Sequence, residues 1–473
     1  MKKMLFAVLA ACPLLFAESY QVNTLSAKQL GMAHTGAGIK LGSESMHFNP
    51  GGLGFLDKKL DISAGATFIM PEVEFHGSQG KTVNEKLGTP IYVYVASRLT
   101  DWLSVGWSFT TPYGNSADYG KNWEGAGLLQ DISLSVYALQ PTAAFKVRND
   151  ISIGVGPAIY FGSFEQSKAL VRPGALGGYR GLATGLNQLG QAYGNPQYVG
   201  YATAVNGIID KYENNSAVSA TFSGDADVAV AANVGILYDL IPNKLALGVG
   251  YRSEAKMKVG NGKAKVNYAG GAQADIATLN QIITAANAAA NLGVPNVTIP
   301  PLEKDAFTAE LPLPANLNTG ISFRPTEKLL LAFDWQMVFW DAYEDLTLAF
   351  DNLGTQVSKK NYHNTDAYRL GAQYTVIDQL DVRLGVYYDE TPVDDDYLTP
   401  ESPSTNKLGT TIGLSFRPMP NLSIDASFLY SNGSGDLGRD ATSGSNPDKA
   451  GDGINGRYEV HAFVPSVGLN FNF

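Results

Sequence analysis

The clearest structural signal in the chain is its last segment, AFVPSVGLNFNF at residues 462–473. Its residues alternate between two kinds. The odd positions are bulky and mostly apolar, and the even positions are small or polar: Phe463, Pro465, Val467, Leu469, Phe471 and Phe473 against Ala462, Val464, Ser466, Gly468, Asn470 and Asn472. A period of two is typical of a β-strand with different surroundings on its two faces. Here one face suits lipid and the other suits a polar interior.

The same alternation recurs at residues 60–68, 151–161 and 380–389. In each segment the bulky side chains fall on one parity, while glycine, serine or charged residues fall mostly on the other. A soluble sandwich also alternates, but it rarely puts bulky side chains on so many strands with so much glycine opposite them. The pattern therefore favours a transmembrane β-barrel.

The composition argues against other classes of protein. Charged residues make up only 16% of the 473 residues, aromatic residues reach 11%, glycine numbers 51 and the mean hydropathy is −0.06. A soluble domain carries about 25% charged residues. A membrane-spanning helix needs a run of about 18 apolar residues, and no such run follows the first twenty positions. The net charge of −10 provides no basic surface for nucleic acid.

Turn residues predict how many strands close the barrel. Six short polar or proline-bearing connections stand at residues 99–101, 147–150, 241–244, 324–327, 377–379 and 417–420. Seven longer polar stretches separate them, at about 73–89, 113–130, 163–221, 256–312, 343–364, 391–406 and 432–456. These connections predict an all-β, antiparallel barrel of about 14 strands, with short turns at one end, long loops at the other and both chain ends on the periplasmic side.

The first residues resemble a secretory signal, with two lysines followed by an apolar run over residues 4–16. We expect residues 1–17 to be removed, leaving Glu18 first. The single cysteine, Cys12, lies in this segment, so the mature chain would have no thiol. Residues 9–12 also resemble a lipoprotein cleavage site, at which Cys12 would be acylated. The apolar run continues past Cys12, which favours ordinary cleavage.

The two longest loops, at about 163–221 and 256–312, carry helical patterns. Apolar residues follow three-four spacing in both: Leu182, Leu186, Leu189 and Tyr193, then Val205, Ile208 and Tyr212 in the first, and Ile276, Leu279, Ile283, Ala286 and Ala290 in the second. In one interpretation these apolar faces pack against one another and cap the barrel. In the other, Leu186, Leu189, Leu279 and Ile283 line a groove in which an apolar solute lands first. Both interpretations can hold together.

Charged and amide side chains fall on the interior parity of several predicted strands: Arg252, Asp334, Gln336, Arg369, Gln373, Asp381, Arg383 and Asp425. An isolated buried ion is costly. These groups should therefore pair with one another, line water, or anchor the segment from Glu18 to Phe55, which is too long and too rich in glycine to be a strand.

Catalytic and metal-binding motifs are missing from the sequence. There is no G-x-S-x-G, H-E-x-x-H, P-loop or paired CxxC motif, and the five histidines are scattered. The acidic stretches at 394–396 and 448–456 lack the full ligand pattern of a calcium loop, so we interpret them as solvated loops. We expect no enzyme activity, no metal site and no cofactor.

The N-terminal segment and several later motifs carry a family resemblance. The motifs are Ser19-Tyr20-Gln21-Val22-Asn23, Ser26, Leu30-Gly31, Ala33, Gly36, Phe48-Asn49-Pro50, Met70-Pro71-Glu72-Val73, Leu311-Pro312-Leu313-Pro314, Tyr388-Asp389-Glu390-Thr391-Pro392-Val393 with Pro400, and the terminal Phe473. This set resembles the FadL/OmpP1 outer-membrane transporters of long-chain fatty acids and other hydrophobic compounds. The resemblance covers essentially the whole mature chain.

The resemblance implies a fourteen-stranded barrel, here residues 57–473, plugged by an N-terminal hatch, here residues 18–56. Solute would be captured outside, passed to a pocket and released laterally through a gap beside a kinked strand. Tyr20 matches an early aromatic residue that projects towards the pocket, and its hydroxyl could favour a solute with a polar head. Family members hold the fatty-acid carboxylate with basic residues, for which Lys168 and Arg172 are the candidates here.

The hatch motif departs from the family pattern at its third position. The family's Asn-Pro-Ala stands here as Asn49-Pro50-Gly51. Proline fixes its own backbone and restricts the residue before it, so residues 49–52 should form a tight turn. Gly51 and Gly52 are expected to supply unusual dihedral angles in that turn. We expect the turn to gate the passage of solute.

Together these observations predict a monomeric channel in the outer membrane of a Gram-negative bacterium, for passive uptake of hydrophobic small molecules, with long-chain fatty acids as the favoured solute. Its other partners would be outer-membrane lipid, lipopolysaccharide and the barrel-assembly machinery, which reads a C-terminal aromatic residue such as Phe473. The alternatives are a general porin-like channel and a surface scaffold or adhesin barrel without fatty-acid specificity. An outer-membrane lipase comes third, since no Ser-His constellation can be placed.

Overall fold

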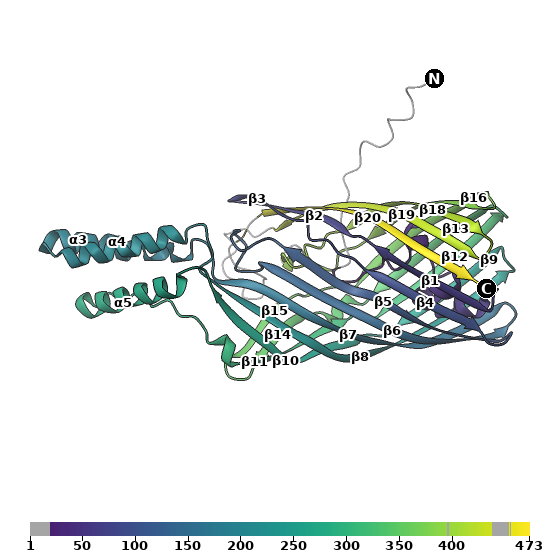
Figure 1. The fold of residues 1–473 in the computed structure, drawn as a ribbon, viewed down its shortest axis with the longest axis horizontal. Helices are drawn as coiled ribbons and strands as arrows, with labels where there is room; N and C mark the ends of the chain where they lie inside the picture. Colours follow the sequence, from purple (N-terminus) through teal and green to yellow (C-terminus); the bar gives the residue numbers. More distant parts are fainter. Residues whose placement is uncertain (1–18, 395–396, 438–453, 455) are drawn as a thin grey trace, which may run out of the picture.

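A computed structural model describes residues 19–394, 397–437, 454 and 456–473. The expected signal segment with Cys12, the acidic pair Asp395 and Asp396, and residues 448–453 and 455 of the second acidic stretch lie outside the described residues. The structure is a long β-barrel with a helical projection at the end far from the C-terminus (Figure 1).

Fourteen antiparallel strands close the barrel, which confirms the predicted architecture. Each strand pairs with the next, and the last pairs with the first, where Ala64 lies opposite Leu469. In order around the barrel the strands are β1 (Leu60–Thr67), β4 (Ile91–Arg98), β5 (Leu103–Asp118), β6 (Asp131–Arg148), β7 (Ile151–Val171), β8 (Val218–Ile241), β9 (Leu245–Arg252), β12 (Asn316–Thr326), β13 (Leu329–Val338), β16 (Thr365–Ile377), β17 (Leu380–Asp389), β18 (Lys407–Met419), β19 (Leu422–Leu437) and β20 (Gly456–Asn472). All six predicted short turns join neighbouring strands.

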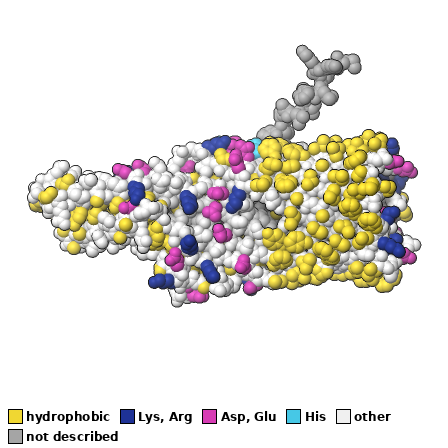
Figure 2. All heavy atoms as spheres, in the orientation of Figure 1, with side chains coloured by type: hydrophobic (Ala, Val, Ile, Leu, Met, Phe, Trp, Pro, Cys, Tyr) yellow, Lys and Arg dark blue, Asp and Glu magenta, His cyan; other side chains and the backbone are white. Residues whose placement is uncertain are grey.

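The alternation in the sequence matches the two faces of the wall. On β20, Val467 and Leu469 are 52% and 46% exposed, while Ser466 and Asn470 are buried. On the face shown in Figure 2, apolar side chains form a broad belt over the half of the barrel nearest the C-terminus, and charged side chains lie on either side of it. Such a belt is the lipid-facing surface of an outer-membrane barrel.

Six further strands extend the wall beyond the belt. β10 (Ala255–Tyr268), β11 (Ala306–Leu313), β14 (Asp345–Phe350) and β15 (Gly354–Lys359) continue outward from β8, and β2 (Met70–Gly77) and β3 (Gly80–Asn84) continue from β20. These strands and the outer ends of β7 and β8 occupy parts of the ranges expected to be long loops. Beyond the lipid a strand no longer needs one apolar face, so the alternation fades and its sequence resembles a polar loop.

Three helices form a projecting arm beyond the barrel mouth, as the apolar spacing predicted (Figure 1). They are α3 (Arg180–Tyr193), α4 (Pro196–Lys211) and α5 (Ala272–Ala290). The short 3₁₀ helix η3 (Ala175–Tyr179) precedes α3, and two others, η4 (Leu302–Lys304) and η5 (Trp340–Ala342), lie in other outer loops. The arm extends away from the barrel instead of covering its mouth. Within the described ranges, no helix is long and apolar enough to cross a membrane.

Residues 19–56, which we call the hatch, lie inside the barrel. They form the short helices α1 (Ala27–Leu30), η1 (Gly42–Glu44), α2 (Ser45–Phe48) and η2 (Pro50–Phe55), joined by turns. Ser26 caps α1, because its Oγ accepts a hydrogen bond from the backbone N–H of Gln29 at 3.1 Å. Leu25, Leu30 and Leu53 are fully buried, so the hatch supplies the apolar core that a barrel of this width would otherwise lack.

Candidate functional site

Polar side chains of the wall hold the hatch in the lumen. Asp334 on β13 accepts hydrogen bonds from the backbone N–H groups of Gly36 and Ala37, at 2.6 and 2.8 Å. Arg252 on β9 donates to the backbone carbonyl of His47 at 3.2 Å. The expectation that some interior charges anchor the N-terminal segment is therefore confirmed.

Other interior charges pair with one another near the end of the barrel where the short turns lie. Arg383 Nη1 is 3.5 Å from a carboxylate oxygen of Asp425, and Arg417 Nη1 is 2.5 Å from one of Asp381. Ion pairs of this kind offset the cost of removing each charge from water. The interior is thus neutralised locally around the hatch.

Asn49 joins the hatch to wall strand β8. The residue is only 1% exposed, and its Nδ2 donates to the carbonyls of Ala37 at 2.7 Å and Ile236 at 2.9 Å. Its Oδ1 accepts from the backbone N–H of Gly51 at 3.0 Å, which caps η2. Pro50 begins this helix, at a position where the missing N–H needs no partner.

The two glycines after Pro50 differ from the sequence-based expectation. Neither Gly51 nor Gly52 is among the described residues with positive φ, so the predicted unusual dihedral angles are wrong. Close packing requires glycine instead. A Cβ at Gly51 would lie 2.7 Å from the backbone nitrogen of Leu237, and one at Gly52 would lie 2.6 Å from Ser45 Oγ. The hatch backbone therefore lies directly against the wall.

Tyr20 sits in a buried aromatic cluster. Its ring centroid lies 4.9 Å from that of Trp340 and 5.7 Å from that of Tyr343, both in edge-on contact. Its hydroxyl donates to the backbone carbonyl of Pro312. Burial raises the pKa of this phenol well above its ordinary value, so it remains a neutral donor. In this structure the hydroxyl is engaged by the protein rather than directed at a solute.

Strand β5 leaves its neighbour β4 after Thr110. A bulge between Thr110 and Tyr113 shifts its register against β6, and Pro112 within this bulge has no N–H to donate. Beyond the bulge the hatch replaces β4 as the partner of β5. The N–H of Val22 donates to the carbonyl of Pro112, and the carbonyl of Tyr20 accepts from the N–H of Gly114, both at 2.9 Å.

The departure of β5 leaves a gap in the wall, which we call the window. At one end the N–H of Ile91 donates to Thr111 Oγ1 at 3.0 Å. At the other end the N–H of Asp118 donates to Asn84 Oδ1 at 2.8 Å. Between these two bonds no backbone hydrogen bond joins the two sides, as far as the described residues show.

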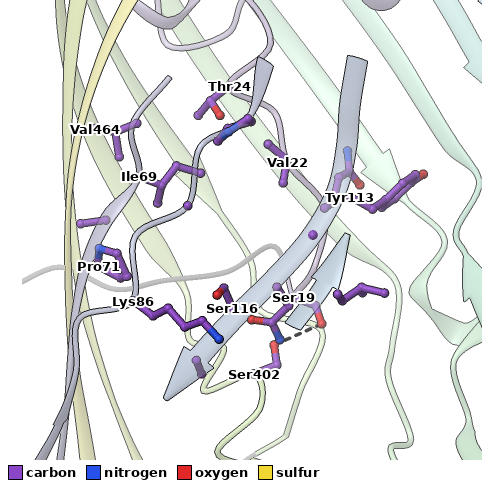
Figure 3. Close-up of a pocket in the computed structure, with 18 of the residues that line it drawn as sticks. Ser19, Val22, Thr24, Ile69, Pro71, Lys86, Tyr113, Ser116, Ser402 and Val464 are labelled. Atoms are coloured by element: carbon purple, nitrogen blue, oxygen red, sulfur yellow. Dashed lines mark hydrogen bonds between the residues drawn. The ribbon is translucent and has the colours of Figure 1, made fainter. Parts of the chain in front are cut away.

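A cavity of about 690 Å³ lies behind the window, between the hatch and the wall. Figure 3 shows its lining from both, with Thr24 of the hatch and Val464 of the wall facing the same space. Leu87, Thr89 and Ile91 also line the cavity. Leu87 and Ile91 are 52% and 40% exposed at the outer surface. The cavity therefore reaches the outside of the barrel through the window, among apolar side chains.

A smaller cavity has Tyr20, Met257, Leu311 and Leu346 in its lining and shares Ser19 and Glu401 with the large cavity. Lys360 and Glu401 form an ion pair at its edge, and Lys360 is only 1% exposed. Burial alone would lower the pKa of Lys360, but the Glu401 carboxylate outweighs this effect and leaves it above the ordinary value. Lys360 in turn holds the pKa of Glu401 below its usual range, although burial opposes this. Both groups are therefore charged.

The two basic residues proposed for carboxylate binding do not line either cavity. Lys168 on β7 is half-buried, with its Nζ 5.6 Å from the centroid of the Phe222 ring. Arg172 is exposed just beyond the end of β7.

Three of the four proposed groove residues share one apolar cluster of the helical arm, and Leu189 lies outside it. Leu186, Leu279 and Ile283 are buried there, and Leu189 is half-buried. This placement agrees with the interpretation that the apolar faces pack against one another. Their role in solute capture stays a prediction.

Sequence reasoning did not single out Lys360, Glu401 or the break at Pro112. Lys360 and Glu401 stand 41 residues apart in two predicted loops, and neither belongs to a motif. Pro112 offered one signal, because a proline inside a strand pattern indicates a bulge or an edge.

Comparisons with known proteins agree with this architecture. A family model described as outer membrane protein transport protein (OMPP1/FadL/TodX) matches residues 8–473. A long-chain fatty acid transport protein of Escherichia coli O6:H1 strain CFT073 is 26% identical over 426 residues, which cover 88% of this chain and 86% of that protein. The 47 kDa outer membrane protein of Pasteurella multocida strain Pm70 is 23% identical over 423 residues, which cover 88% of each chain.

Two solved structures share the fold. A FadL homologue of Pseudomonas aeruginosa superposes with a TM-score of 0.72 at 19% identity, covering 96% of this chain and 100% of its own. The toluene transporter TodX of P. putida superposes with a TM-score of 0.64 at 15% identity, covering 97% of this chain and 99% of its own.

Proposed function

Because the chain belongs to the OMPP1/FadL/TodX family of outer-membrane transport proteins, we propose that it carries long-chain fatty acids passively across the outer membrane. The coarser assignment follows from the family, whose members are outer-membrane transporters of hydrophobic compounds and not enzymes. The finer assignment rests on one observation. A cavity enclosed by the hatch opens sideways, through a window flanked by apolar side chains, in place of opening straight through the barrel.

The proposed route begins at the helical arm. An apolar solute would bind first at Leu186, Leu189, Leu279 and Ile283, of which all but Leu189 belong to the apolar cluster of the arm. It would then move past Tyr20 into the cavity and leave through the window into the membrane. The favourable transfer of an apolar chain from water to lipid supplies the driving force, so no energy source is needed.

Lys360 is our candidate for the polar end of the route. Its ammonium lies beside the apolar lining of the smaller cavity, and it carries three N–H donors of which Glu401 needs only part. A fatty-acid carboxylate would take a remaining donor while its chain lies along Met257 and Leu311. Lys168 and Arg172 are weaker candidates, because neither reaches a cavity.

Uptake of a labelled long-chain fatty acid, in cells that lack their own transporter, tests the proposal. Thr89 is exposed at the window and lines the cavity, so Thr89→Trp should block the exit. Thr100→Trp, in the turn between β4 and β5, is the matched control and should transport like the parent. Equal uptake by all three proteins at matched surface levels would contradict lateral release.

Substrate class is tested in the same cells with two labelled solutes of equal chain length, a fatty acid and a fatty alcohol. Lys360→Met combined with Glu401→Gln removes the buried pair without leaving an unpaired charge. We expect the double variant to lose preference for the acid over the alcohol. Toluene serves as a third solute, because the aromatic lining around Tyr20 also suits a neutral ring and TodX is a toluene transporter. Faster uptake of toluene than of either chain would favour aromatic hydrocarbons.

A further inference from the structure

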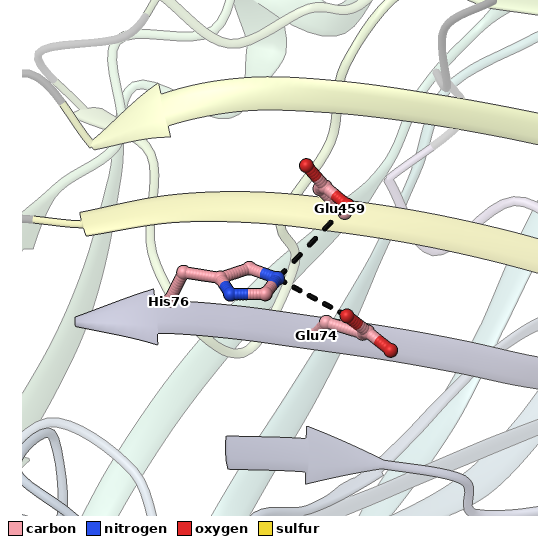
Figure 4. Close-up of side chains that lie close together, drawn as sticks. All are labelled: Glu74, His76 and Glu459. Carbon is pink, nitrogen blue, oxygen red and sulfur yellow. Dashed lines mark hydrogen bonds and ion pairs between the residues drawn. The ribbon is translucent and has the colours of Figure 1, made fainter. Parts of the chain in front are cut away.

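The outward face of strands β2 and β20 carries a group of metal-ligating side chains just beyond the apolar belt. The two strands pair antiparallel, with Glu74 opposite Glu459 and His76 opposite Arg457. Side chains alternate along a strand, so these four residues point outward while their neighbours, such as the fully buried Phe75, point inward. Figure 4 shows His76 between the two glutamates.

Three ligand atoms converge in this group. His76 Nε2 lies 3.1 Å from Glu74 Oε2 and 3.9 Å from Glu459 Oε2, and all three atoms lie within 4.8 Å of one another. A tetrahedral zinc ion with bonds of about 2.0–2.2 Å holds neighbouring ligand atoms roughly 3.4 Å apart. The side chains therefore need only small rotations to bind one ion.

Two cations hold the other oxygen of each carboxylate. Lys81 pairs with Glu74 Oε1, and Arg457 Nε lies 3.5 Å from Glu459 Oε1. Each glutamate thus gives its Oε1 to a cation and directs its Oε2 towards His76. Groups that orient a ligand through its second atom are a regular part of metal sites. The two cations also offset the charge of the two carboxylates, which would otherwise repel each other.

We propose that Glu74, His76 and Glu459 bind a divalent metal ion of the zinc type. Imidazole suits zinc and its neighbours in the first transition series, whereas calcium and magnesium prefer oxygen ligands alone. Three protein ligands leave a fourth position to solvent. The ion would link the outer part of β2 to β20. Since β2 borders the region of the window, the link would stiffen the wall there. This inference does not depend on the identity of the transported solute.

Isothermal titration of the purified full-length protein with zinc chloride tests the site. The protein is held in detergent, carries no histidine tag and is first stripped with chelator. We expect one zinc ion per chain. Affinity should fall at least about tenfold in His76→Ala and in Glu459→Gln, the size expected when a ligand or its support is removed. Absence of zinc binding by the parent protein would overturn the proposal.

His461→Ala is the matched control. His461 lies two residues from Glu459 on the same outward face of β20, but its Nδ1 contacts the hydroxyl of Tyr430 at 3.1 Å. This variant should bind zinc like the parent. Loss of binding in His461→Ala, or parental binding in His76→Ala, would place the ion elsewhere and overturn the assignment. Calcium is titrated in parallel. Equal affinity for calcium and zinc would show that the three residues act as an unselective acidic surface, which would also overturn the proposal.

Discussion

Residues of the hatch are fixed individually by the wall. Asn49 is nearly fully buried and makes three hydrogen bonds. In two of them its side chain donates to the backbone carbonyls of Ala37 and Ile236. Gly51 is glycine because β8 lies too close for a Cβ. Tyr20 lines the smaller cavity and packs edge-on against Trp340. Each residue therefore combines a packing role with a position on the proposed route.

Gly51→Ala should push the hatch away from β8. Overpacking of a tight site costs about 1–3 kcal/mol, so we expect a loss of that size in the free energy of unfolding, together with altered fatty-acid uptake. Urea unfolding of protein refolded in lipid vesicles measures the first quantity. Gly185→Ala in α3 is the control, because nothing lies within 4 Å of the added Cβ. Identical stability of the two variants would show that the hatch moves freely.

Tyr20→Phe and Tyr20→Ala separate the hydroxyl from the ring. Tyr20→Phe leaves the carbonyl of Pro312 without its donor, at a cost of about 1–3 kcal/mol, but it preserves the shape of the smaller cavity. Tyr20→Ala also enlarges the smaller cavity. We expect uptake close to the parent in the first variant and a changed set of retained ligands, seen by mass spectrometry, in the second. The same ligands in Tyr20→Ala and the parent would exclude a role for the ring in binding.

The secondary-structure elements of this protein pack against different surroundings. Barrel strands alternate between lipid and a packed interior, whereas β5 exchanges a wall partner for the hatch at its bulge. The helices of the arm project beyond the barrel mouth, and they bury their apolar faces against one another and against the outer ends of β7 and β8. A substitution should therefore have different consequences on the belt, in the interior and in the arm.

Leu469→Arg tests the lipid face of β20. An arginine near the middle of the bilayer costs roughly 2–4 kcal/mol, so the yield of folded barrel in the membrane should fall. Ala462→Arg on the same strand points into the large cavity, where there is room for the side chain. Heat-modifiable migration on gels measures the folded fraction. Equal losses at the two positions would refute the assignment of faces.

Leu279→Ser and Leu189→Ser test the arm. Leu279 is fully buried between helices, and truncation of such a leucine costs about 2–5 kcal/mol. We expect the arm of Leu279→Ser to become sensitive to protease while the barrel stays intact. Leu189 is half-buried, so its replacement should spare the arm and reduce uptake mostly at low solute concentration. Normal uptake in both variants would leave packing as the only role of this cluster.

The whole molecule is a closed wall around a folded plug. Hydrogen bonds and buried leucines connect the hatch to strands around the circumference, and the large cavity opens at the side. This arrangement differs from a porin, whose lumen is an open aqueous channel. It therefore predicts that little ion current passes through the barrel.

Planar-bilayer conductance tests this prediction. The parent protein should pass little ion current, because the hatch fills the lumen. Deletion of residues 19–56 should raise the current to that of an open barrel, provided the variant still shows heat-modifiable migration. A large current through the parent protein would favour the porin-like alternative over a plugged transporter.

The sequence determined the strand count, the turns and the two faces of the wall, because each depends on residues that are neighbours in the chain. Alternation at 462–473 and the proline or charged residues at 417–420 act locally, and the structure has both where the pattern put them. Helical spacing at residues 272–290 was equally local. Family motifs added the hatch. The expectation of unusual dihedral angles at Gly51 came from the general conformational freedom of glycine and was wrong, because glycine is required there by close packing against a distant strand.

Only the tertiary structure decided which distant residues meet. Lys360 and Glu401 form a pair, Asn84 and Asp118 close one end of the window, and Glu74 approaches Glu459. Each of these contacts depends on barrel closure and on the register between strands. A shift of one residue would turn every side chain of a strand to the opposite face. Closure and register are set by the sum of all pairings around the wall, and for that reason no single segment of the sequence contains them.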